Sequence, residues 1–194
     1  MTARRMDRET RTIVLDLKRE ILARQPAGWP PDSLFTFLRG LPPATVGTRF
    51  GSELVARILD GAGLATRKGG TRLYDLVVGG GDGLRVEVKT STEFPTRRFQ
   101  QVRDPRPGVA RERWRYDALV CLGVRPDDLT IWLLPGPQAA ELIADGTIGV
   151  QHTDSETNWF FPNEDAPTCP FNRFLVTRRE LVGAIRRMKP LVGD

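Results

Sequence analysis

The segment from Leu73 to Lys89 most constrains the fold, because it predicts two short strands joined by a tight turn. It reads LYDLVVGGGDGLRVEVK, in which two apolar runs flank a glycine-rich stretch. Such a pattern is typical of a β-hairpin. Side chains two positions apart on a strand share a face, so Glu87 and Lys89 are expected to point together, while Val86 and Val88 point into a core. The turn is expected to bring Asp75 back toward Glu87 and Lys89.

Two carboxylates and an ammonium at one place indicate a particular chemistry. A hard cation such as Mg²⁺ takes oxygen ligands and usually keeps several waters. A lysine nearby can stabilise the hydroxide that forms from one of those waters. The hairpin therefore predicts a divalent-metal site for phosphodiester hydrolysis, with Asp75, Glu87 and Lys89 as its residues.

The remaining pattern predicts a mixed α/β domain with a central sheet. Helical periodicity or capping signals predict helices at 7–25, 33–38 (a single turn), 46–61, 138–144 and from the capping box at 177–180 onward. Strands are expected at 64–67, 72–78, 84–90, 98–103, 116–124 and 129–134. The run at 116–124 is nearly all apolar, which is typical of a strand covered on both faces. Residues 145–170 are weakly patterned.

The chain is expected to form one domain, in which an N-terminal helical segment, 1–45, packs on a core of residues 46–194. Apolar runs are too short to span a bilayer and no secretory signal is present at the N-terminus, so we expect a cytoplasmic protein without a membrane partner. The single histidine, His152, excludes nuclease schemes that need several imidazoles. In the same region Trp159, Phe160 and Phe161 are expected to anchor the core or a loop. No metal-ligand spacing involves Cys121 or Cys169.

Positive charge is concentrated in one segment. The net charge is +5, and residues 97–115 hold seven arginines against two acids. Forked arginine side chains suit phosphates and guanine edges. The segment is therefore the predicted DNA footprint, with Arg97, Arg98 and Arg103 nearest the hairpin. The complete set is Arg97, Arg98, Arg103, Arg106, Arg111, Arg113 and Arg115.

These motifs resemble the PD-(D/E)XK phosphodiesterase superfamily, which includes many type II restriction endonucleases. Tyr74-Asp75 stands where the family has proline-aspartate, and Glu87-Val88-Lys89 matches its acid-x-lysine triplet. The resemblance covers about residues 46–134. It implies a restriction-endonuclease-like fold, in which a central mixed β-sheet is flanked by helices.

The resemblance also implies roles for individual residues. Asp75 and Glu87 would hold Mg²⁺, for which Mn²⁺ can substitute, with the carbonyl of Val88 as a further ligand. Lys89 would position or activate the attacking water. Glu53 matches the family's acidic residue on the preceding helix, and Gln100 or Gln101 matches a glutamine that some branches place after the lysine.

The expected function is a metal-dependent DNA endonuclease linked to defence or to phage. A homodimer would let two active sites cut both strands of a duplex. Two alternatives stay open at this stage. One is a Holliday-junction resolvase or an exonuclease of the same superfamily. The other is a catalytically silent DNA-binding protein that keeps the sheet and the arginine segment.

Overall fold

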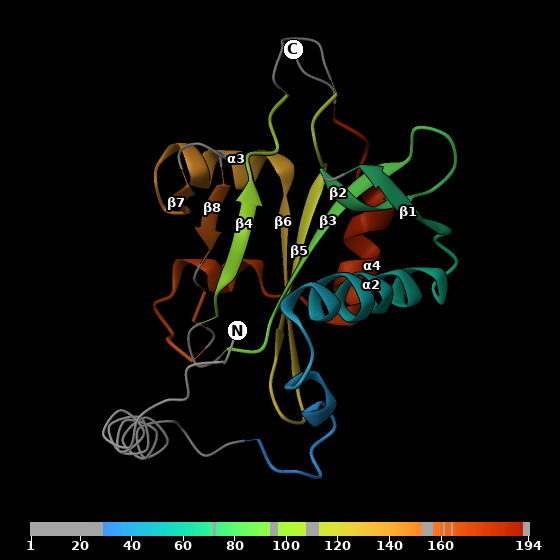
Figure 1. Ribbon diagram of the computed structural model, residues 1–194. Helices are drawn as coiled ribbons and strands as arrows, with labels where there is room; N and C mark the ends of the chain where they lie inside the picture. The colour runs from blue at the N-terminus through green and yellow to red at the C-terminus, as the bar shows by residue number, and fades with distance from the viewer. Residues whose placement is uncertain are drawn as a thin grey trace, which may run out of the picture.

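A computed structural model describes residues 29–71, 73–93, 97–107, 113–152, 157–160, 162–163 and 165–191, with backbone alone at 70, 71, 152 and 159. Within these residues two sheets lie side by side (Figure 1). The larger has the order β1-β2-β3-β5-β6 and the smaller β4-β8-β7. The strands of the larger sheet are β1 (Thr66–Thr71), β2 (Tyr74–Val78), β3 (Leu84–Ser91), β5 (Ala118–Val124) and β6 (Leu129–Pro135). Those of the smaller are β4 (Phe99–Arg103), β7 (Gly149–His152) and β8 (Thr157–Phe160).

The larger sheet is mixed, as the family resemblance implies. β3 and β5 run parallel, and the pairs β1–β2, β2–β3 and β5–β6 are antiparallel. Every residue of β5 is buried. Its apolar run therefore belongs to a strand covered on both faces, which confirms the expectation for this segment.

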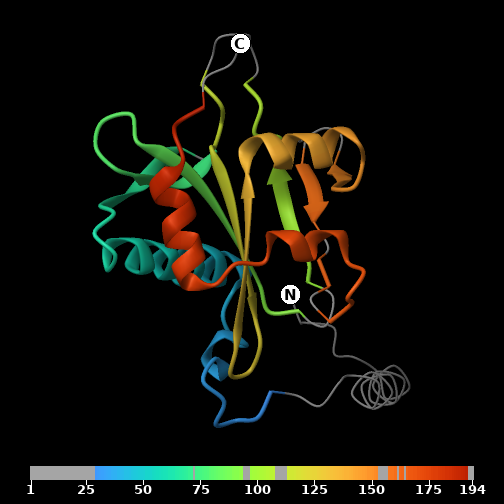
Figure 2. The same ribbon diagram turned by 180° about the vertical axis from the view of Figure 1, so that it is seen from behind.

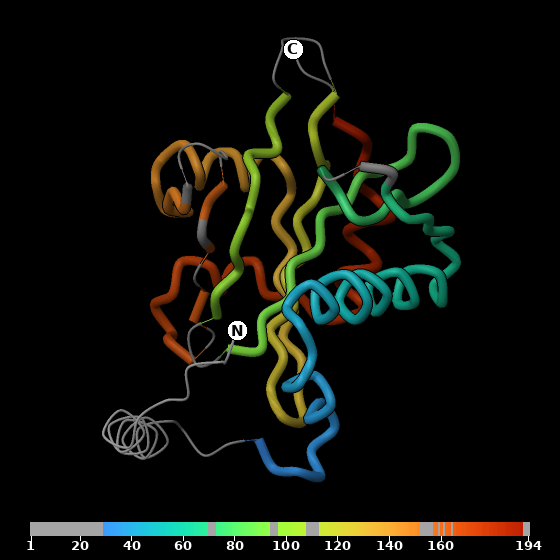
Figure 3. The backbone as a smooth tube through the Cα atoms, viewed as in Figure 1, coloured from blue at the N-terminus to red at the C-terminus, as the bar shows by residue number. Residues whose placement is uncertain are grey.

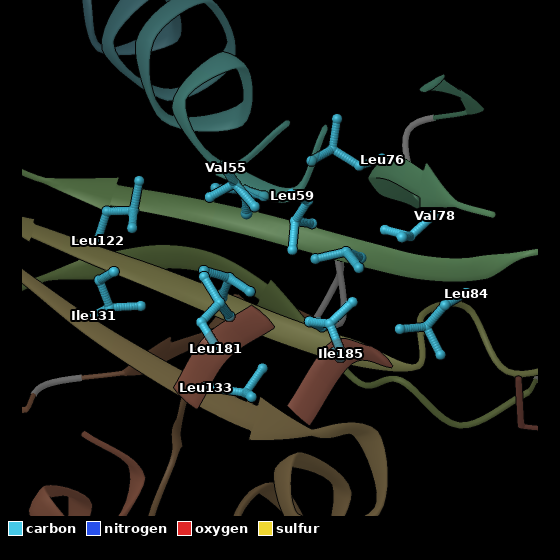
Figure 4. Close-up of a cluster of buried hydrophobic side chains, with 14 residues drawn as sticks. Val55, Leu59, Leu76, Val78, Leu84, Leu122, Ile131, Leu133, Leu181 and Ile185 are labelled. Carbon is cyan, nitrogen blue, oxygen red and sulfur yellow. The ribbon is translucent and has the colours of Figure 1, made fainter. Parts of the chain in front are cut away.

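Two helices cover one face of the larger sheet. A π-helical stretch, η2 (Thr45–Gly51), leads directly into α2 (Ser52–Asp60), and α4 (Arg178–Arg187) begins at the predicted capping box. Val55 and Leu59 of α2 and Leu181 and Ile185 of α4 meet alternate residues of β3 in one buried cluster (Figure 4). Val86 and Val88 belong to that cluster, as their alternation in the sequence predicts.

The opposite face is covered by the smaller sheet, α3 (Gly136–Ala144) and a 3₁₀ turn, η4 (Pro170–Phe174) (Figure 2). Phe99, Trp132 and Phe160 pack together there, with ring centroids 5.7–5.9 Å apart. The weak pattern at 145–170 thus includes two strands, β7 and β8, that the sequence did not predict. Each is only four residues long. β8 pairs with β4 and with β7, and this pairing, rather than an alternation of apolar and polar residues, defines both strands.

Two strands begin later than the sequence predicts, at points where a side-chain carboxylate accepts a backbone N–H. β1 begins at Thr66 rather than 64, because residues 61–64 still close the end of α2 and the Asp60 carboxylate accepts the Thr66 N–H at 2.7 Å. β5 begins at Ala118 rather than 116. There the buried Asp117 carboxylate accepts the backbone N–H groups of Arg85 and Leu191, both at 2.6 Å.

The described N-terminal segment lies beside the turn between β5 and β6 (Figure 3). A 3₁₀ turn, η1 (Thr36–Leu38), falls where a helical turn is predicted. Trp29 and Leu38 pack with Val124, and the Phe35 N–H donates to the Pro126 carbonyl at 2.9 Å. The helix predicted at 7–25 lies outside the described residues. Across the described helices, none combines the length and apolar character needed to cross a membrane.

Candidate active site

The β2–β3 hairpin brings Asp75 and Glu87 together on one face of the larger sheet. The strands pair with Leu76 opposite Val86 and Val77 opposite Arg85. One further step in this antiparallel register sets Asp75 opposite Glu87, and cross-strand partners share a face. Their carboxyl groups are within hydrogen-bonding reach of each other. Two acids 12 positions apart in the sequence therefore converge, as the hairpin predicts.

Lys89 completes the group. Its Nζ lies 2.6 Å from Glu87 Oε1, and its side chain is 21% exposed against 8% for that of Glu87. The backbone of β3 also contacts Asp75, because the Val88 N–H donates a hydrogen bond to Asp75 Oδ2 at 2.8 Å. The Asp75 carboxylate thus accepts a backbone N–H of β3 just beyond the Leu76–Val86 pair of the β2–β3 ladder, and this hydrogen bond fixes the position of the carboxylate.

Burial dominates the electrostatics of Glu87. Removal from water raises the pKa of this carboxyl to about 7, Lys89 opposes the rise, and the neighbouring Asp75 adds to it. The side of β5 behind the site is apolar, with Leu119 opposite Glu87 and Cys121 opposite Lys89. Burial likewise raises the pKa of the Cys121 thiol well above its usual range. On the side of β5, the site is therefore bordered by buried apolar side chains.

An open cleft of about 610 Å³ gives access to these groups. Its floor is β3 from Glu87 to Ser91, and Tyr74 and Asp75 lie beside it. One wall is the segment from Leu41 to Thr48, which includes the start of η2. The other wall is formed by Arg98 and the first part of β4, from Phe99 to Gln101. A substrate in the cleft would contact both walls.

Both predicted glutamines lie in this second wall, and both are exposed. Gln101 has φ of +56°, which is uncommon for a residue other than glycine. The irregularity coincides with a break in the β4–β8 register between Phe99 and Val102. The Gln101 N–H donates to the side-chain oxygen of Gln151 on β7 at 2.7 Å. Gln151 therefore supports a bulge that borders the cleft.

Glu53 lies outside the cleft, in an adjoining hollow of about 390 Å³ between α2 and β1. Thr48, Tyr74 and Asp75 line both hollows, so Asp75 stands at their border. The carboxylate of Glu53 pairs with Arg57 at 2.7 Å. The structure thus brings Asp75, Glu87, Lys89, Gln100 and Gln101 into one cleft and leaves Glu53 next to it.

The predicted arginine footprint does not form one surface. Arg97, expected to contact DNA near the site, is fully buried. Its Nη1 donates to the carbonyls of Glu93 and Val124 at 2.7 and 2.8 Å, so it joins the loop after β3 to the end of β5. This placement corrects the expectation for Arg97. Arg98, by contrast, is exposed and borders the cleft, 3.7 Å from Glu93 Oε2.

The other arginines of the segment are mainly engaged in the loop between β4 and β5. Arg106 pairs with Asp104, and Arg115 donates to the Asp104 carbonyl at 3.3 Å. Arg113 donates to the Gly83 carbonyl and lies 3.4 Å from Asp117. Arg103 is half-buried on β4, and Arg111 lies outside the described residues. None of these four described side chains lines the cleft.

Two residues that sequence reasoning missed support the cleft. Gln151 holds the Gln101 bulge, and the buried Ser91 hydroxyl accepts the N–H groups of Glu93 and Arg98 at 3.2 and 3.3 Å. Ser91 could have been found, because it continues the two-residue spacing of Glu87 and Lys89 on β3. Gln151 carries no local signal, since its role depends on a pairing 50 residues away along the chain.

The donor set suits a hard divalent cation. Asp75 and Glu87 supply carboxylate oxygens in contact with each other, and a shared cation would offset the repulsion and burial that otherwise favour a proton on Glu87. Within the described residues, no third histidine, cysteine or acid completes a larger metal-binding group. Such a site leaves room for waters, as Mg²⁺ prefers.

Comparisons with known proteins add little to this geometry. No family model matches the sequence, and no curated protein matches it. Among solved structures, that of a bacterial homing endonuclease, I-Ssp6803I, matches with a TM-score of 0.46 and 13% identity, covering 76% of this chain and 100% of that chain. A likeness at that level carries no argument about what this chain does.

Proposed function

We propose that the chain is a metal-dependent DNA endonuclease of the PD-(D/E)XK type. One observation carries the proposal: the carboxyl groups of Asp75 and Glu87 and the ammonium of Lys89 converge at the floor of an open cleft. A structural ion pair would need only two of these groups. The third, and the access from solvent, are what a hydrolytic site requires.

Asp75 and Glu87 would hold Mg²⁺ or Mn²⁺, with the Val88 carbonyl as a further ligand. The ion would supply Lewis-acid stabilisation of the phosphate and a more acidic water. The chain's own residues then have distinct tasks. Val88 N–H orients the Asp75 carboxylate at 2.8 Å, and Lys89 places positive charge beside the scissile phosphate. Gln100 and Gln101 border the substrate, and Glu53 is a candidate to act from the adjoining hollow.

In the proposed reaction, water adds to the phosphorus and the bond to the 3′ oxygen breaks. The water's proton leaves with solvent or with the departing oxygen, so the products are a 5′-phosphate and a 3′-hydroxyl. Cleavage of both strands would require two active sites, for which we propose a homodimer.

The test is cleavage of supercoiled, linear and four-way-branched DNA with Mg²⁺ or Mn²⁺, in wild type and in the variants Asp75→Asn and Lys89→Ala. We expect each variant to lose at least about 10²–10³-fold in rate while retaining DNA affinity. Asp82→Asn is the matched control, because Asp82 lies in the same hairpin with a fully exposed side chain.

Nicking or linearisation of the supercoiled circle identifies an endonuclease. Cutting confined to free ends or to branched DNA would instead assign an exonuclease or a resolvase. Binding without cleavage of any substrate would assign a silent DNA-binding protein. Undiminished Mg²⁺-dependent cleavage by Asp75→Asn would refute the site.

A further inference from the structure

A second group of cations lies on α4, away from the cleft. Five exposed basic residues occupy α4 and the two positions after it, and the only acid there is Glu180. We call this group the α4 cationic surface. Its members are Arg178, Arg179, Arg186, Arg187 and Lys189.

The acids of the described residues do not neutralise this charge. Within the part of the chain that the structure describes, none of the five forms an ion pair with a carboxylate. Glu180 is engaged otherwise, because its Oε2 accepts the Thr177 N–H and hydroxyl at 2.8 and 2.9 Å in the capping box. Arg57, Arg98 and Arg106 are exposed and each lies beside an acid, whereas the exposed Arg39, Arg49, Arg67 and Arg173 form no ion pair with a carboxylate among the described residues.

Three members of the surface line a hollow of about 480 Å³ near the end of α2. Arg178 and Arg179 stand at one end of the hollow and Arg186 at the other, where its Nη2 donates to the Ala62 carbonyl at 2.8 Å. Val182 and Gly183 lie between them and form an apolar floor. Figure 2 shows α4 on the near side, with α2 behind it. None of these residues lines the cleft.

Two features of α4 are unfavourable for the helix itself. Arg178 and Arg179 occupy its first turn, where the helix dipole is already positive and acids are the stabilising choice. Gly183 lies in its interior, where glycine lowers helix stability. Nothing described requires that glycine, since the nearest atom to an added Cβ would be Arg187 Nη1 at 3.4 Å. Both features suit an anion that approaches the helix closely.

We propose that the α4 cationic surface binds the phosphate backbone of a nucleic acid outside the cleft. The inference rests on the proposed function only in taking nucleic acid as the polyanion. Arginine forks pair with phosphate oxygens, and the helix N-terminus adds positive potential. Contacts of this kind give affinity and salt dependence without sequence preference.

The test is fluorescence anisotropy with a labelled 20-base-pair DNA duplex in EDTA, so that no cleavage is needed. We compare wild type, Arg178→Gln/Arg179→Gln and a control of equal charge change, Arg125→Gln/Arg173→Gln, whose residues lie at the β5–β6 turn and in η4. The Arg178 and Arg179 side chains are exposed and form no hydrogen bond or ion pair with the described residues, so the variant is expected to melt near the wild-type temperature.

For the α4 variant, we expect affinity at 0.1 M salt to fall by about one to two orders of magnitude. The slope of log affinity against log salt should become shallower by about 2, because two phosphate contacts are lost. The control should keep a slope near wild type. An unchanged slope in the α4 variant, or an equal loss in the control, overturns the proposal. Because the readout is binding, an absence of cleavage by wild type would refute the proposed function and leave this result intact.

Discussion

At the scale of single residues, Glu87 shows how position decides chemistry. The same carboxyl on an exposed strand would ionise well below neutral pH. Here it is 6% exposed, next to a second carboxylate, and its pKa rises to about 7 despite the ion pair with Lys89. A proton would therefore compete with the proposed metal ion for this group within the physiological range.

A pH dependence of stability follows from Glu87. Below pH about 4.5 the carboxyl is protonated in folded and unfolded chains alike. Between about 4.5 and 7 only the unfolded chain releases its proton, so the free energy of unfolding of the metal-free protein falls with rising pH, by about 3 kcal/mol from this group. Glu87→Gln should lack this part of the fall. Denaturant titrations in EDTA at pH 5 and pH 8 measure it, and an equal fall in both proteins would contradict the assignment.

Arg97 and Arg98 show what a sequence cannot distinguish at this scale. Both follow the acid-x-lysine strand, and both are suited to phosphate. The first is fully buried and donates to two backbone carbonyls, whereas the second is exposed at the cleft. Composition locates the charge along the chain, but the folding of the following strand decides which side chain reaches solvent.

At the scale of elements, the sequence predicted those helices and strands that carry a signal within their own residues. The helix from Val46, the β2–β3 hairpin, β5 and the capped α4 each carry their own periodicity or capping signal, and the structure confirms them. In the smaller sheet β4 was predicted, but β7 and β8 were missed, because β8 pairs with β4 more than 50 residues away. The layer that covers β5 on the side opposite α2 and α4 therefore forms through contacts between segments that are distant in the sequence.

Two helical glycines should respond oppositely to the same substitution. Gly183→Ala is expected to raise the free energy of unfolding by about 0.5–1 kcal/mol, because the helix interior gains a better former and the added Cβ meets only the end of the Arg187 side chain. Gly51→Ala is expected to destabilise the protein, because its Cβ would collide with the Thr90 hydroxyl on β3.

Denaturant unfolding of both variants checks this pair. Adding Thr90→Ala to Gly51→Ala should recover part of the loss, since the Thr90 hydroxyl is buried without a hydrogen-bond partner in the structure. Destabilisation by Gly183→Ala would show that the glycine has a structural task within the fold.

At the scale of the whole molecule, the sequence predicted the floor of the cleft but not its walls. Asp75, Glu87 and Lys89 come from one hairpin, so their convergence follows from strand periodicity and a short turn. The walls of the cleft come from the segment at 41–48 and from β4, and a third segment, β7, supports the Gln101 bulge. Their assembly depends on how the layers pack.

Metal binding should be visible in the stability of the entire fold. A cation that binds only the folded protein raises the free energy of unfolding by about 3 kcal/mol when its concentration is about 100 times its dissociation constant. We expect Mn²⁺ or Mg²⁺ to raise the melting temperature of wild type and not of Asp75→Asn. The control is Glu93→Gln, which removes an exposed acid at the edge of the same cleft and should respond like wild type. Equal shifts in all three proteins would place the cation elsewhere.

The two walls of the cleft come from different parts of the fold, the segment before α2 and the first strand of the smaller sheet, while its floor is β3 of the larger sheet. Substitutions that reshape either wall can therefore alter which substrates fit without displacing the acidic pair beneath. For the proposed nuclease, substrate selection and catalysis would therefore depend on different segments, so that its target could change during evolution while its chemistry stayed constant.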